Sequence, residues 1–180
     1  MSVLSVLPAG TFNIDPTHSR VGFSARHAMV TKVRGSFNEY SGSGTVADGT
    51  ASLYIDMAVS SIDTRNADRD AHLQSPDFFD APIYPKITFA STSVKDVGAE
   101  KVIVEGNLTI KDVTKPISIE FEYTGTATDP YGNARFGFEG VAEINRKDFG
   151  LTWNAALETG GFLVSENVKL EFEISAISAK

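Results

Sequence analysis

The sequence contains no cysteine among its 180 residues. Disulfide bonds, thiolate nucleophiles and zinc sites built from cysteine ligands are therefore excluded. Positive charge is also scarce, because 16 Lys and Arg residues stand against 23 Asp and Glu residues, which gives a net charge of −7 and a pI near 4.9. A nucleic-acid partner requires a basic surface, so we expect none.

Long hydrophobic runs are missing as well. No segment reaches the about 20 consecutive apolar residues that a membrane-spanning helix needs, so a membrane-spanning protein is not expected. The apolar start at residues 1–7, MSVLSVL, has no Lys or Arg before it and is short for the core of a signal peptide. These absences predict a cytoplasmic protein.

Most of the chain alternates apolar and polar residues with period two, the pattern of half-buried β-strands. The clearest case is residues 52–59, in which Leu53, Ile55 and Met57 share one face. Asp48-Gly49, just before it, is a typical two-residue hairpin turn. About eight such strands suit an antiparallel barrel or a sandwich. Glycines within the strands supply the bends that closure needs and favour the barrel.

The alternation stops in one place, where a short helical insertion is predicted near residues 66–80. Asn66 can cap this helix, because its side chain can accept a hydrogen bond from a free backbone N–H. Arg69, His72 and Leu73 then follow at spacings that place them on one side of the helix. No linker or repeat divides the chain, so the all-β barrel and its insertion are predicted to form a single domain over residues 1–180.

Three histidines suggest a metal site or an active site. A metal-assisted hydrolase would use His27, His72 and Asp70, because imidazole and carboxylate groups bind zinc. No two histidines have the spacing of a ligand pair, however, and the sequence lacks both HExxH and GxSxG. We therefore expect no metal, no cofactor and no catalytic residue, and we keep the hydrolase as an alternative.

Six motifs follow one another along the chain: Asp15-Pro16-Thr17-His18-Ser19, Gly35-Ser36-Phe37, Ser61-Ile62-Asp63-Thr64, Asp77-Phe78-Phe79, Thr114-Lys115-Pro116 and Arg146-Lys147-Asp148-Phe149-Gly150. Taken in order, these motifs resemble the YceI-like family, whose fold is lipocalin-like. The resemblance covers almost the whole chain and implies a barrel that binds a long-chain isoprenoid or a similar amphipathic lipid, such as a polyprenyl phosphate or a quinone. Many family members are exported, whereas this chain shows no leader pattern.

If the apolar faces surround such a lipid, the lining comes from large apolar side chains on several strands. Arg69 either binds a polar head group or forms an ion pair with Asp148 or near Arg146. A solid-core, stress-related structural protein is a further alternative, and a homodimer is left open. The candidate lipid-binding residues are Phe23, His27, Phe37, Leu53, Ile55, Met57, Arg69, Phe78, Phe79, Phe89, Val104, Ile119, Phe138 and Arg146. Of these, Phe78 and Phe79 either gate the interior or only hold the insertion on the barrel rim.

Overall fold

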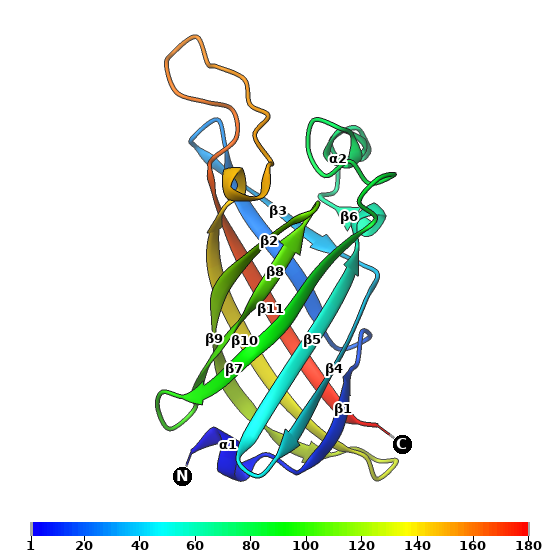
Figure 1. Cartoon of the computed structure of the whole chain (residues 1–180). Coiled ribbons are helices and arrows are strands. Elements are labelled where there is room, and N and C mark those ends of the chain that lie inside the picture. The colour runs from blue at the N-terminus through cyan, green and yellow to red at the C-terminus, as the bar shows by residue number, and fades with distance from the viewer. Residues whose placement is uncertain (1, 180) are drawn as a thin grey trace.

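The alternating segments form the strands of a closed antiparallel β-barrel in the computed structural model, which describes residues 2–179 (Figure 1). Four short helices accompany the strands: α1 (Val3–Val6), α2 (Ala67–Gln74) and the 3-10 helices η1 (Val59–Ser61) and η2 (Arg146–Phe149). The strands are β1 (Gly10–Ile14), β2 (Arg20–His27), β3 (Thr31–Phe37), β4 (Tyr40–Ala47), β5 (Thr50–Ala58), β6 (Ile62–Asp63), β7 (Lys86–Asp96), β8 (Lys101–Ile110), β9 (Val113–Thr128), β10 (Ala134–Asn145) and β11 (Asn167–Ser178).

The eleven strands occupy eight positions around the barrel. Three positions are each shared by two successive strands: β1 with β2, β3 with β4, and β5 with β6. Strand β11 closes the barrel because it pairs with β1 near one end and with β2 nearer the other. In the same way β4 pairs with β1 and β5, while β3 pairs with β2 and β6. The prediction of a lipocalin-like barrel of about eight strands is confirmed.

The residue pattern of β4 and β5 follows the sequence prediction. Asp48 and Gly49 form the turn between them, and both have positive φ angles, 51° and 73°, as a two-residue hairpin turn of this type requires. Ile55 is completely buried in the barrel interior and Met57 nearly so, whereas Tyr54, directly before Ile55, is 43% exposed. The period-two pattern therefore identifies the inward face correctly.

The two ends of the barrel carry different helices and loops. Helix α2 and the loop of residues 150–166 lie at one end, which we call the α2 end, and α1 lies at the other, the α1 end (Figure 1). Helix α2 begins as predicted, since the Asn66 side chain accepts a hydrogen bond from the Arg69 backbone N–H at 2.9 Å. At the opposite end Val3 of α1 is fully buried. Within residues 2–179, none of the helices is both long and apolar enough to cross a bilayer.

Asp15 joins the corner between β1 and β2 to β10. Its carboxylate accepts hydrogen bonds from Arg135 Nη1 at 2.7 Å, from the Thr17 hydroxyl at 2.7 Å and from His18 Nδ1 at 2.8 Å. Arg135 also contacts the Asp129 carboxylate at 2.9 Å. The hydrogen bond from Arg135, followed by that from Thr17, holds the pKa of Asp15 well below its ordinary value of 3.8. The conspicuous first motif of the sequence thus has a structural role here.

This network predicts a specific loss of stability in acid. Because the pKa of Asp15 is lower in the folded state, the unfolded state binds more protons as the pH falls below about 4, and folding loses the contribution of the ionised carboxylate. We expect Asp15→Asn to be less stable at neutral pH and to lose less stability on acidification than the unsubstituted protein, as measured by urea unfolding at a series of pH values. Asp112→Asn, at an exposed hairpin turn, is the control. Parallel curves for Asp15→Asn and the unsubstituted protein would contradict this role.

Candidate functional site

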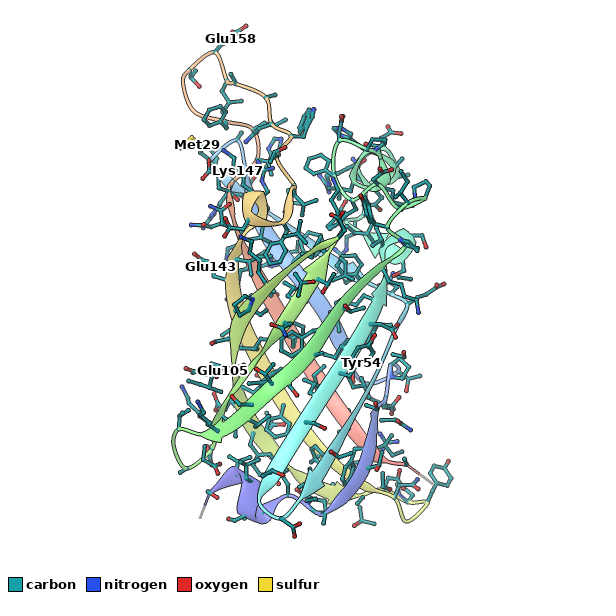
Figure 2. The ribbon with its side chains drawn as sticks, in the orientation of Figure 1. Met29, Tyr54, Glu105, Glu143, Lys147 and Glu158 are labelled. Carbon is teal, nitrogen blue, oxygen red and sulfur yellow. The ribbon has the colours of Figure 1, made fainter. Side chains whose placement is uncertain are left out.

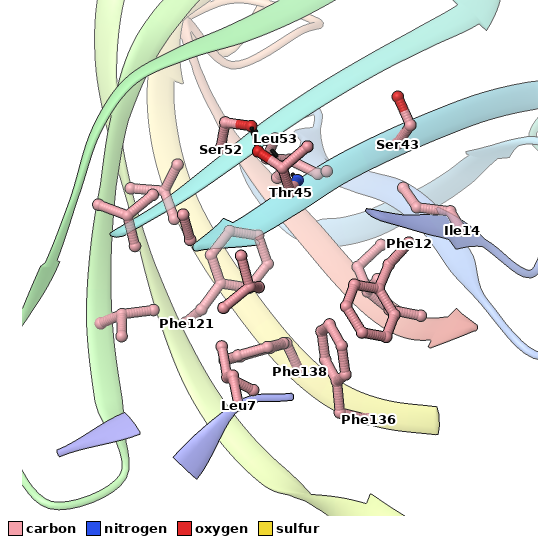
Figure 3. A pocket seen from close by; sticks show the side chains of 18 of the residues that line it. Leu7, Phe12, Ile14, Ser43, Thr45, Ser52, Leu53, Phe121, Phe136 and Phe138 are labelled. Carbon is pink, nitrogen blue, oxygen red and sulfur yellow. Dashed lines mark hydrogen bonds between the residues drawn. The ribbon is translucent and has the colours of Figure 1, made fainter. Parts of the chain in front are cut away.

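The barrel interior contains an apolar cavity of about 90 Å³ at the α1 end (Figure 3). Helix α1 contributes to its wall through Leu4, and Leu7 follows directly after the helix. The polar side chains of Thr45 and Ser52 lie at its edge and bond to each other at 2.8 Å. The largest side chains of the lining are those of Phe12, Phe121, Phe136 and Phe138, and Leu53 also contributes.

A second cavity, of about 130 Å³, lies inside the barrel at the α2 end. Its strand residues include Phe23, Ile55, Met57, Phe89 and Ile119. The insertion contributes Leu73, Phe78 and Phe79, and the loop of residues 150–166 contributes Leu151 and Val164. This cavity is apolar on nearly all sides, and among residues 2–179 Arg146 is the one charged residue in its lining.

Two phenylalanine rings lie at the boundary between the cavities. Phe121 lines the α1-end cavity and Phe172 lines the α2-end cavity. Their ring centroids are 5.9 Å apart, within the range of favourable aromatic packing. The interior is therefore divided by side chains, although both cavities lie within the same barrel.

Arg146 is buried at the α2 end, with only 3% of its surface exposed. It lies at the start of η2, where β10 ends. Its guanidinium donates four hydrogen bonds to backbone carbonyl groups: Nε to Ser165 at 2.8 Å, Nη1 to Leu151 at 2.6 Å and to Trp153 at 2.9 Å, and Nη2 to Val164 at 3.3 Å. One side chain thus fixes both branches of the loop of residues 150–166 over the barrel.

The charge of Arg146 has no carboxylate partner within 4 Å among residues 2–179. Burial lowers the pKa of Arg146, and the charge of Glu166 only partly offsets this effect. Glu166 itself bonds to Lys147 Nζ at 2.6 Å. A guanidinium has five N–H groups, and the four bonds to carbonyl groups use four of them, which leaves one N–H of Nη2 outside them. Arginine stays charged even when buried, so the site combines an apolar cavity with a single cation.

Most of the predicted site residues converge on the two cavities, although their contact with a ligand stays a prediction. The α2-end cavity gathers Phe23, Phe37, Ile55, Met57, Phe78, Phe79, Phe89, Ile119 and Arg146. The α1-end cavity gathers Leu53, Val104 and Phe138. The other two, His27 and Arg69, lie outside both cavities.

The ion pair predicted for Arg69 is not present in the described part of the chain. Arg69 instead donates from Nε to the Thr64 hydroxyl at 2.8 Å and from Nη2 to the Thr64 carbonyl at 2.7 Å. Asp70 accepts hydrogen bonds from the N–H and hydroxyl of the same threonine. The prediction of a pair with Asp148 or near Arg146 is therefore wrong, because a neighbouring threonine satisfies the guanidinium. Arg69 faces an outer groove rather than the interior.

The residues of the alternative metal site do not come together. His72 Nε2 bonds to Asp77 at 2.8 Å, Asp70 is engaged by Thr64, and His27 is exposed at the end of β2. Residues 2–179 contain no group of three His, Asp or Glu side chains that could hold a metal ion. The geometry required by the hydrolase alternative is thus not formed by these three residues.

Phe78 holds the insertion against the loop of residues 150–166. It is 6% exposed, and its ring packs against Trp153, with the ring centroids 5.4 Å apart. His72 packs against the same tryptophan at 4.7 Å. The insertion and the loop therefore form one cover over the α2-end cavity. Phe78 thus packs against the loop, while gating by Phe78 and Phe79 and attachment of the insertion to the barrel rim both stay predictions.

Sequence reasoning missed two parts of this site. Leu4 and Leu7, which line the α1-end cavity, belong to the apolar run at residues 1–7, which was considered only as a signal sequence. Leu151 and Val164 come from a loop without periodicity. The apolar run outside any predicted strand was the available signal for Leu4 and Leu7. No sequence signal was available for Leu151 and Val164.

A closed antiparallel barrel with an apolar interior and a polar group at one end defines a lipocalin-like protein, a class whose barrels hold side chains or one small ligand. Within this class, a sequence model of the YceI-like domain matches residues 12–176. The chain therefore belongs to the YceI-like family.

Relatives and solved structures agree with this assignment. A UPF0312 protein of Staphylococcus aureus is 38% identical over 164 residues, which cover 89% of this chain and 93% of the relative. The YceI protein of Campylobacter jejuni is 30% identical, with a TM-score of 0.75 over 86% of this chain and 90% of that one. A polyisoprenoid binding domain from Saccharophagus degradans is only 16% identical and shares the fold, with a TM-score of 0.70 over 96% of this chain and 100% of that one.

Proposed function

We propose that this protein binds and carries a long-chain isoprenoid lipid, with the tail in the barrel interior and the polar head group near Arg146. The observation that carries the proposal is the single buried cation at the end of an otherwise apolar interior. Its free N–H suits either a phosphate oxygen of a polyprenyl phosphate or a carbonyl oxygen of a quinone. The polyisoprenoid binding attributed to the Saccharophagus degradans domain supports the same ligand class.

The energy for binding would come from the tail. Transferring a CH₂ group from water to an apolar site contributes about 0.8 kcal/mol. A cavity of about 150 Å³ engineered in another protein binds benzene, so cavities of about 90 and 130 Å³ each suit a short apolar segment. A longer tail would extend through both cavities when Phe121 and Phe172 rotate apart. Two apolar cavities support a binding protein over a solid-core structural protein.

The proposal assigns no catalytic step to the chain. Arg146 can bind and orient an oxygen atom but is a poor proton donor, because its guanidinium remains protonated. The apolar lining supplies neither a nucleophile nor a general base. Carriage rather than conversion of the lipid is therefore the role that this interior supports. The cytoplasmic location stays a prediction.

Native mass spectrometry of the purified protein tests this function. We expect a mass above that of the chain, and organic extraction of the same sample should release an isoprenoid lipid that accounts for the difference. Protein stripped of lipid by denaturation, refolded and mixed with a lipid extract of the host is the control and should regain the added mass. A mass equal to that of the chain in both samples would contradict the proposal.

A further inference from the structure

A polar groove of about 800 Å³ runs over the outer surface of β2 and β3 and the segment that follows β6. It lies outside the barrel and is separate from both apolar cavities. Three carboxylates line it, from Asp63, Glu171 and Glu173, against five cations. An excess of positive charge is concentrated here on a chain whose net charge is −7. The five cations are Arg20, Lys32, Arg34, Arg65 and Arg69.

In the part of the chain that the structure describes, two of the five cations bond to other side chains of the fold. Arg20 pairs with Glu171 at 3.2 Å, and Arg69 donates to Thr64. Within residues 2–179, Lys32, Arg34 and Arg65 have no carboxylate within 4 Å. These three side chains are therefore available to an external anion.

Two cations face each other across the hairpin of β2 and β3, an arrangement that does not stabilise it. Lys32 on β3 lies directly opposite Arg26 on β2 in the register of the hairpin. Like charges in directly opposite positions of an antiparallel pair destabilise the sheet. Arg26 donates to the backbone carbonyl of Val30 rather than to a carboxylate. An anion bound at this edge would relieve the repulsion.

The same hairpin ends in exposed apolar side chains. Met29 and Val30, at the turn between β2 and β3, are 68% and 73% exposed, and Phe162 in the neighbouring loop is 54% exposed. The Ala28 N–H bonds to the Leu163 carbonyl at 2.8 Å, which holds the turn beside the loop. Figure 2 shows Met29 directed away from the barrel. The exposed apolar side chains of Met29 and Val30 thus lie next to the cations of the groove.

We propose that this edge of the α2 end docks on an anionic lipid bilayer, with Met29 and Val30 inserted at the interface. The inference rests on the proposed function, because a lipid carrier must exchange its ligand with a membrane. Cations near a bilayer are attracted by its negative surface potential, and an apolar tip adds burial in the headgroup region. The acidic remainder of the chain is repelled by the same surface, so the field orients the protein. Glu158, at the far end of the loop of residues 150–166, opposes docking (Figure 2).

Co-sedimentation of the full chain with vesicles tests the docking. We expect binding to vesicles of equal parts phosphatidylcholine and phosphatidylglycerol, weakened by added salt, and much less binding to pure phosphatidylcholine. Lys32→Glu should weaken the binding by about an order of magnitude, because it replaces an attraction by a repulsion. Met29→Ser with Val30→Ser should weaken it through lost insertion, whereas Glu158→Lys should strengthen it.

Lys95→Glu is the matched control, because it makes the same change of charge on β7, outside the groove, at an exposed side chain 3.6 Å from Glu105. Lys95→Glu should bind the vesicles as strongly as the unsubstituted protein does. Equal losses in Lys32→Glu and Lys95→Glu, or equal binding to neutral vesicles, would overturn the proposal. A fluorescent quinone analogue, added without vesicles, reports the interior separately. If the protein binds the analogue but not the vesicles, the docking proposal is rejected and the proposed function stands. If it binds the vesicles but not the analogue, the proposed function is rejected.

Discussion

Arg146→Met is expected to lower the free energy of unfolding by about 3 kcal/mol or more, because it leaves four backbone carbonyls without their donor and each unsatisfied buried acceptor costs about 1–3 kcal/mol. Water reaching the loop would satisfy some of these carbonyls, so the individual costs do not add in full. The loop of residues 150–166 should also become sensitive to limited proteolysis. Urea unfolding and protease digestion measure the two effects.

Lys147→Met provides the comparison at the adjacent position. Lys147 bonds to Glu166 at 2.6 Å, but both side chains are more than 40% exposed. Exposed ion pairs contribute less than about 1 kcal/mol, so this variant should resemble the unsubstituted protein in both assays. Arg146→Met with unchanged stability and an uncleaved loop would show that the carbonyl contacts do not hold the loop.

In the folded fraction, Arg146→Met should weaken the binding of a polyprenyl phosphate more than the binding of a quinone of equal tail length. The reason is that a phosphate gains more binding energy from a cation than a neutral quinone does.

Ile55→Trp is expected to abolish binding of an isoprenoid lipid while changing stability little. Ile55 is fully buried and borders the α2-end cavity of about 130 Å³, so an indole ring has space in the empty interior. Overpacking a solid core typically costs about 1–3 kcal/mol, and we expect a smaller loss here. Lipid occupancy measured by native mass spectrometry and urea unfolding of the lipid-free protein give the two values.

Ile62→Trp serves as the control for packing. Ile62 is 5% exposed and belongs to the hydrophobic core, but it borders neither cavity. The larger side chain should therefore cost the full overpacking penalty. If Ile55→Trp lost as much stability as Ile62→Trp, the interior around Ile55 would behave as a solid core.

The barrel could be predicted because its determinants are local in the sequence. Alternation identified the inward positions Ile55 and Met57, and the turn residues Asp48-Gly49 marked the hairpin. The helix of the insertion began at the predicted cap, Asn66. Each of these signals depends on the preferences of neighbouring residues, which a single sequence displays directly.

The polar contacts could not be predicted in the same way. Arg146 binds carbonyl groups in the loop of residues 150–166, and backbone carbonyls carry no sequence signature. Arg69 was expected to find a carboxylate and instead bonds to Thr64, five residues earlier. The outer groove was missed because its cations come from β2, β3 and residues 63–69, and only the closed barrel brings these segments together.

Under the proposed function, the contact between Phe121 and Phe172 would set chain-length selectivity. A prenyl chain short enough to stay on the α2 side leaves the two rings in contact. Each longer homologue has to separate them, and the free energy of that separation is incurred once, however many units follow. Two aromatic rings would then discriminate between short and long homologues, without a barrel of different length. Substitutions at Phe121 and Phe172 would then change the preferred homologue of this protein, with every strand left in register.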